Sequence, residues 1–182
     1  MSWWRWFAVI KRLLAAFVFV AVLFAGVASA GHKQEEYWRY ARWAGCTAAL
    51  ITSDERSMLG SFYRPHALYI GTQDTSQHFM LIVLFHEIGH CLQFQRYTLP
   101  EIQEIYQTRV ALELDADRLA ADLACSMGMD GKRMLRDIFE WAHEEFGYDG
   151  DPEHGSLAER IGQGELAPAC NPAPIQAPIL GR

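Results

Sequence analysis

The chain has 182 residues and carries 16 Lys and Arg against 22 Asp and Glu, a formal net charge of −6 with neutral histidines. This acidic balance leaves no basic stripe that could bind phosphates, so nucleic acid is excluded as an expected partner. The 152 residues that follow the first 30 suit one domain with an ordinary hydrophobic core.

Residues 1–30 have the pattern of a secretory signal. Basic side chains precede an uncharged apolar stretch over residues 13–27, and residues 28–30 (Ala-Ser-Ala) match a signal-cleavage site. We therefore expect a mature chain that starts at Gly31 and is periplasmic or secreted, with a net charge of −9 because three basic residues are removed. The alternative is an uncleaved membrane anchor with the domain facing away from the cytoplasm. The membrane is a partner only in that case.

The expected domain, residues 31–163, opens with a helix and a strand. Residues 34–51 carry an aromatic and alanine stripe among charged side chains, which is typical of an amphipathic helix. Residues 53–65 contain glycine and proline breakers and predict an irregular connection. Residues 66–71 (HALYIG) have strand character.

A long helix is expected from residue 74 or 75 to about residue 95. It is apolar on all sides over residues 79–85, as in a helix enclosed by others. His86 and His90 then stand at i and i+4 on one face, so both imidazoles can bind one ion. Neutral imidazole suits zinc, and a catalytic zinc takes three protein ligands and a water, so we expect one Zn²⁺ per chain. Glu87, beside the metal, is the expected general base.

The next helix supplies the expected third ligand. A capping box with proline in its first turn starts at Thr98, and the pattern predicts one helix continuing to Met127. Glu113 and Asp117 lie at i and i+4 on it. If this helix packs on the first, Glu113 completes a His-His-Glu set and Asp117 accepts the Nδ1 proton of one histidine. The alternative for this acidic cluster is a solvated helix face.

The C-terminal third predicts two further helices around a loop. Residues 132–146 are amphipathic, and residues 147–155 form a polar loop that carries His154. A second capping box opens a short helix over residues 156–161. His154 could reach over the metal and stabilise an oxyanion, or it could be an ordinary exposed loop histidine. Residues 164–182 are proline-rich and describe an extended tail.

The chain holds an even number of cysteines, Cys46, Cys91, Cys125 and Cys170. In an exported chain this predicts two disulfides, and the sequence leaves all three connectivities open. The wide, uneven spacing does not fit a structural zinc site.

His86-Glu-Ile-Gly-His90 followed by Glu113-x-x-Ala-Asp117 resembles the gluzincin class of zinc metallopeptidases. Within that class the chain is most similar to the CAAX prenyl endopeptidases and their soluble periplasmic relatives. The resemblance implies a zincin-like catalytic core on two metal-binding helices, with a zinc-bound water activated by Glu87.

The resembled group also has a late His-Pro-x-x-x-x-Arg-Ile element near the active site. Here His154-Gly-Ser-Leu-Ala-Glu-Arg160-Ile161 keeps the spacing, although Gly155 replaces the proline. The resemblance further implies that an edge strand before the zinc helix, residues 66–71, binds the substrate backbone as an added strand. The alternative is a strand that serves only the core.

The expected fold is mainly α with a small β-sheet (α+β). The expected function is hydrolysis of peptide bonds in a peptide or protein substrate, with an endopeptidase favoured because no device for binding a chain terminus is evident. A zinc-dependent amidase acting on a cell-wall or other non-protein amide would use the same ligands. A non-catalytic, zinc-stabilised binding module is the other alternative.

Overall fold

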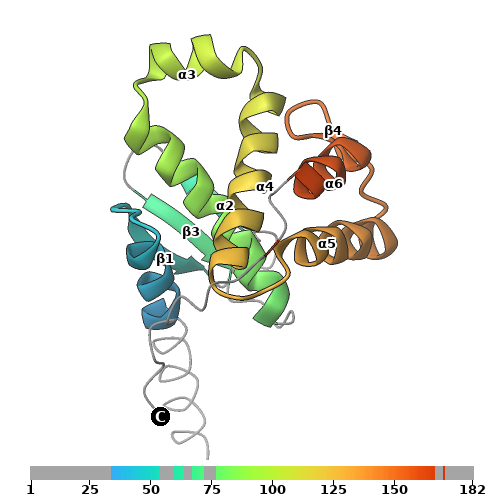
Figure 1. Cartoon of the computed structure of the whole chain (residues 1–182), viewed down its shortest axis with the longest axis horizontal. Coiled ribbons are helices and arrows are strands. Elements are labelled where there is room, and N and C mark those ends of the chain that lie inside the picture. Colours follow the sequence, from blue (N-terminus) through green and yellow to red (C-terminus); the bar gives the residue numbers. More distant parts are fainter. Residues whose placement is uncertain (1–33, 54–59, 64–66, 72–76, 167–169, 171–182) are drawn as a thin grey trace, which may run out of the picture.

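The structure, a computed structural model, describes residues 34–53, 60–63, 67–71, 77–166 and 170. Residues 34–43 are helical, and the elements that follow are β1 (Ala49–Ser53), β2 (Gly60–Tyr63), β3 (Ala67–Gly71), α2 (Gln77–Arg96), α3 (Leu99–Tyr106), α4 (Arg109–Ser126), α5 (Gly131–Phe146), β4 (Gly150–Asp151), β5 (Gly155–Ser156) and α6 (Leu157–Leu166). α2 and α4 pack together at the centre, with the larger sheet on one side and α5 and α6 on the other (Figure 1). The expected mainly helical fold with a small β component is confirmed.

The larger sheet has the strand order β1-β3-β2. β1 runs parallel to β3, with Ala49 opposite Ala67, and β2 runs antiparallel to it, with Gly60 opposite Ile70. The expectation that residues 66–71 form an edge strand is therefore wrong. β3 is the central strand, and its backbone groups are already paired on both sides, so it cannot accept a substrate strand.

Two further expectations for this region are corrected. The first helix does not continue to residue 51, because it ends at residue 43 and β1 begins at Ala49. Gly45, with a φ of 88°, makes the turn between them. The expected irregular connection over residues 53–65 contains β2, a four-residue strand that begins at a glycine and that intrinsic strand preference does not predict.

α2 is enclosed, as its sequence predicts. Ile82, Leu84, Phe85 and Ile88 are each at most 1 % exposed, and the helix contacts the sheet, α4 and α5. Its expected N-terminal cap at residue 74 or 75 lies outside the described residues. Because other elements cover the second half of the helix, Glu87, His90 and Gln93 are buried against protein there, and only the last turn of that half is exposed.

α2 and α4 approach closely where both carry small residues. A Cβ added to Gly89 would lie 3.1 Å from the carbonyl oxygen and 3.2 Å from the Cα of Ala116. Ala116, Ala120 and Ala124 are fully buried along the same seam. The absence of larger side chains at this crossing lets the two polar faces meet.

The expected single helix from Thr98 to Met127 is interrupted. The capping box at Thr98 is present, but α3 ends after Tyr106, where Gln107 adopts a φ of 54°. Thr108 then caps α4 by accepting a hydrogen bond from the backbone N–H of Ala111 at 3.1 Å. This corner directs α3 away from the helix pair (Figure 1).

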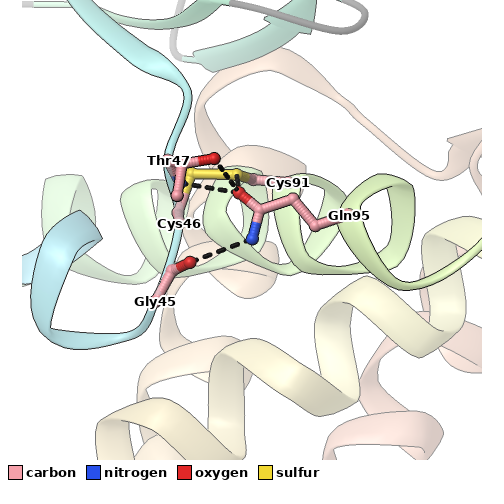
Figure 2. Close-up of a disulfide and its surroundings, with 5 residues drawn as sticks. All are labelled: Gly45, Cys46, Thr47, Cys91 and Gln95. Atoms are coloured by element: carbon pink, nitrogen blue, oxygen red, sulfur yellow. Dashed lines mark hydrogen bonds between the residues drawn. A yellow bond between two sulfur atoms is a disulfide. The ribbon is translucent and has the colours of Figure 1, made fainter.

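The cysteines form the two expected disulfides, Cys46–Cys91 and Cys125–Cys170. The first ties the segment before β1 to α2. Gln95, one turn after Cys91, reinforces the link because its carboxamide accepts hydrogen bonds from Thr47 and donates one to the carbonyl oxygen of Gly45 (Figure 2).

The expected polar loop over residues 147–155 contains the short β4–β5 hairpin. The second capping box is confirmed, because Ser156 and Glu159 bond reciprocally at the start of α6. α6 ends at Leu166, so it runs past the point where the extended tail was expected. In the described ranges no helix is long and apolar enough to cross a membrane. The expected signal over residues 1–30 lies outside those ranges.

Candidate metal centre

The three predicted ligands meet at the crossing of α2 and α4. Nε2 of His86 lies 3.1 Å from Nε2 of His90, and Oε2 of Glu113 lies 3.2 Å from both nitrogens. His90 and Glu113 are buried, and the side chain of His86 is 13 % exposed. This group of two imidazole nitrogens and one carboxylate oxygen could hold a metal ion.

Asp117 lies beside Nδ1 of a ligand histidine, as the sequence predicts. Its Oδ1 lies 2.8 Å from Nδ1 of His86, so the ring presents Nε2 toward the ligand group. Arg160 donates to both oxygens of the same carboxylate at 2.8 Å and stacks over the ring of Phe139 at 4.4 Å. Asp117 is fully buried, and this bidentate ion pair balances its charge.

His90 has a partner that the sequence analysis missed. Its Nδ1 lies 2.9 Å from Oε1 of Gln93, a buried residue in the next turn of α2. The i+3 spacing on one helix face is the sequence signal that could have identified it. The rings of His86 and His90 therefore each have an acceptor at Nδ1 and direct Nε2 toward Glu113.

The electrostatics of the cluster keep Glu113 ionised. Burial acts to raise the pKa of Glu113, but hydrogen bonds and charge from His86 and His90 hold it far below its usual range. Burial lowers the pKa of His86, yet the hydrogen bonds to Asp117 and Glu113 outweigh that effect and raise it to about 10. The cluster is thus strongly attractive to positive charge.

Glu87 has a different environment from the other acidic residues. It is 7 % exposed, and burial raises its pKa, with the nearby histidines opposing that shift. Within the described ranges no hydrogen bond to its carboxylate is found. A buried carboxylate that points into open space beside the ligand group is free to exchange a proton there.

Two cavities adjoin the ligand group and share His86, Glu87 and His154. The first, which we name the polar cavity, has a volume of about 410 Å³. Its other lining residues are Phe94, Ile102, Gln103, Tyr106, Gln107, Thr108, Arg109, Leu112, Glu113 and His90. The second, the apolar cavity, has a volume of about 500 Å³. It is lined mainly by α2, α5 and the ring of Phe146, so the space beside Glu87 extends in two directions.

His154 lies between the two cavities, on the connection between β4 and β5. Its Nδ1 is 2.8 Å from Oδ2 of Asp151. Oδ1 of the same carboxylate accepts hydrogen bonds from the backbone N–H groups of Glu153 and His154. The sequence analysis missed Asp151 as this partner. Gly155 has a φ of 89°, which proline cannot adopt. The backbone at the position where the resembled group has proline is therefore different in this chain.

The donor set fits zinc in kind. Catalytic zinc sites use imidazole nitrogen and carboxylate oxygen, and a set of two histidines and one glutamate leaves a coordination position for water. Magnesium and calcium prefer oxygen ligands throughout, which this group does not offer.

No protein family, curated protein or solved structure matches the chain. Functional inference therefore rests on the geometry and chemistry of the site.

Proposed function

We propose that the chain is an exported zinc-dependent peptidase with a zincin-like core of the gluzincin type. The observation that carries the proposal is the convergence of His86, His90 and Glu113 from two helices to within 3.2 Å, beside a buried and unpaired Glu87 at the junction of two cavities. The two disulfides are compatible with the extracytoplasmic location proposed here.

In this proposal, His86, His90 and Glu113 hold the ion. Zinc in such a site supplies a Lewis acid and lowers the pKa of a bound water. Glu87 accepts the proton of the attacking water and delivers it to the leaving amine. Asp117 holds the ring of His86 with Nε2 toward the ligand group. His154, which is oriented by Asp151 and lines both cavities, would donate a hydrogen bond to the developing oxyanion.

The shape of the cleft favours an internal peptide bond as the substrate. Because the polar and apolar cavities extend from Glu87 in different directions, chain can be accommodated on both sides of the scissile bond. The apolar cavity, lined by residues such as Val83, Leu135 and Phe139, suits a large apolar side chain of the substrate.

The test is Glu87→Gln, assayed with an unfolded protein substrate and a fluorogenic peptide mixture. Bound zinc is expected to remain near one equivalent, while hydrolysis falls by about 10²- to 10⁴-fold, the usual contribution of a general base. Glu104→Gln, at an exposed position on α3, is the matched control and is expected to retain full activity. Unchanged hydrolysis in Glu87→Gln would remove Glu87 as the base, and a wild-type chain that binds no zinc would overturn the proposal.

A further inference from the structure

The two ligand histidines are supported by chemically different groups. His86 faces the carboxylate of Asp117, whereas His90 faces the neutral carboxamide of Gln93. Gln93 is 2 % exposed, so its polar atoms have no access to bulk water and must be satisfied by protein. The orientation of this carboxamide decides whether His90 meets an acceptor or a donor.

The surroundings of Gln93 allow only one orientation. Its Nε2 lies 3.0 Å from the carbonyl oxygen of Leu112 and 3.0 Å from Oδ2 of Asp115, and both of those atoms accept hydrogen bonds. A flipped carboxamide would place its oxygen against two acceptors and leave a buried donor facing His90. Oε1 therefore faces His90, whose Nδ1 must carry the proton.

Asp115 is itself fixed from two sides. The hydroxyl of Tyr106 donates to its Oδ2 at 2.7 Å, and Arg118 donates to its Oδ1 through Nη2 at 2.7 Å. Tyr106 also lines the polar cavity. A continuous series of hydrogen bonds thus connects the wall of that cavity, through Asp115 and Gln93, to His90.

We propose that Gln93 is the positioning residue of His90, and that Asp115 and Tyr106 act through it. Gln93 holds His90 in the tautomer that has its proton on Nδ1, so Nε2 keeps its lone pair for the ion. Gln93 does this without adding charge, while Arg118 balances the carboxylate of Asp115 as Arg160 balances that of Asp117. This role rests on the proposed zinc function and extends it to residues that do not touch the ion.

The first test replaces Gln93 with methionine, which has a similar shape and no hydrogen-bonding carboxamide. In the full-length chain, zinc affinity measured by chelator competition is expected to fall about 10- to 100-fold, the usual effect of removing a group that orients a metal ligand. In the metal-free chain, the proton on Nδ1 of His90 is expected to be observed by NMR in the wild type, where Gln93 accepts its hydrogen bond, and to be lost by exchange or by a change of tautomer in Gln93→Met. A purely structural role would lower stability without changing the tautomer.

A double substitution at positions 93 and 115 is expected to restore the hydrogen bond to His90. The double variant Gln93→Glu with Asp115→Asn restores an acceptor for His90 and a donor between positions 93 and 115. One oxygen of the new carboxylate then faces the carbonyl oxygen of Leu112, so full recovery is not expected. The double variant is expected to recover the Nδ1–H tautomer and zinc affinity to within about tenfold of wild type. Because it keeps both side chains polar and close to their original size, it remains informative if methionine at position 93 prevents folding. Loss of the tautomer in the double variant would overturn the proposal.

Gln95→Met is the matched control. Gln95 lies on the same helix, and its carboxamide bonds to Thr47 and Gly45 rather than to a ligand histidine (Figure 2). Its loss is expected to lower stability while leaving zinc affinity and the His90 tautomer unchanged. If Gln93→Met changes neither the zinc affinity nor the tautomer of His90, the positioning role of Gln93 is overturned while the proposed function still stands. A wild-type chain that binds no zinc would overturn the proposed function, whereas the NMR comparison would still test the contact between Gln93 and His90.

Discussion

Two carboxylates near the ligand group each have a compensating arginine. Asp117 is paired with Arg160, and Asp115 is paired with Arg118. Glu87 is the exception, because in the described part of the chain its carboxylate has no cation or hydrogen-bond donor in contact. Its carboxylate opens onto the two cavities, and a carboxylate with a raised pKa and no fixed partner is suited to exchanging a proton there.

For single residues, the sequence identifies pairs that are separated by one helical turn. His86 and His90, and likewise Glu113 and Asp117, are recognised because i and i+4 share a helix face. Asp151 was missed because its contact with His154 depends on the turn between β4 and β5, where Gly150 and Gly155 both have positive φ. Side-chain contacts set by such a turn have no fixed spacing in the sequence.

The pH dependence of the β4–β5 connection follows from Asp151. Partial burial acts to raise the pKa of Asp151, but hydrogen bonds from His154 and Glu153 lower it from 3.8 to about 2. Because the folded pKa is depressed, the stabilising effect is fully present above about pH 4 and is lost as the pH falls through about 2. The NMR shifts of the backbone amides of Glu153 and His154 are expected to titrate with a midpoint near pH 2. A midpoint near 3.8 would show that these hydrogen bonds are not formed in solution.

The pairing of α2 with α4 is the element on which the ligand group depends. The spacing between the HExxH segment and the acidic pair predicts that two helices meet, and the structure brings them together. The break between α3 and α4 was not predicted, because Gln107 is not a residue type that favours positive φ and Thr108 is not followed by a capping-box Glu. β2 was missed for a similar reason, since it is only four residues long and begins at Gly60, a residue type that is depleted in strands.

Gly89 controls how closely the two helices approach. Gly89→Ala would normally stabilise a helix by about 1 kcal/mol, but here the new Cβ meets the backbone of Ala116 at 3.1 Å, and that backbone must move. We expect no gain in the free energy of unfolding and a zinc affinity reduced by about tenfold or more, because the ligand group spans the shifted seam. Urea denaturation and chelator competition measure the two effects.

Gly162 provides the comparison within the same protein. It lies inside α6, and a Cβ added there meets nothing within 4 Å. Gly162→Ala is therefore expected to raise the free energy of unfolding by about 0.5 to 1 kcal/mol without changing zinc affinity. Equal effects of the two substitutions would contradict the close-approach argument.

For the molecule as a whole, a bound ion would connect elements that the disulfides do not. Zinc present at about a thousand times its Kd would add about 4 kcal/mol to the free energy of unfolding. For a domain of this size that corresponds to a Tm about 10 °C higher. Addition of EDTA is expected to remove this increment in differential scanning calorimetry, and EDTA already saturated with zinc is the control. A Tm insensitive to EDTA would argue against a structural contribution from the ion.

The order of the cross-links along the chain has a consequence for how the molecule matures. The disulfides join the first cysteine to the second and the third to the fourth, so the loops 46–91 and 125–170 follow one another without overlap. A polypeptide that emerges from its N-terminus presents Cys46 and Cys91 before any competing thiol exists. The first bond can close correctly by order of arrival alone, and oxidation need not be followed by reshuffling to reach the native pairing.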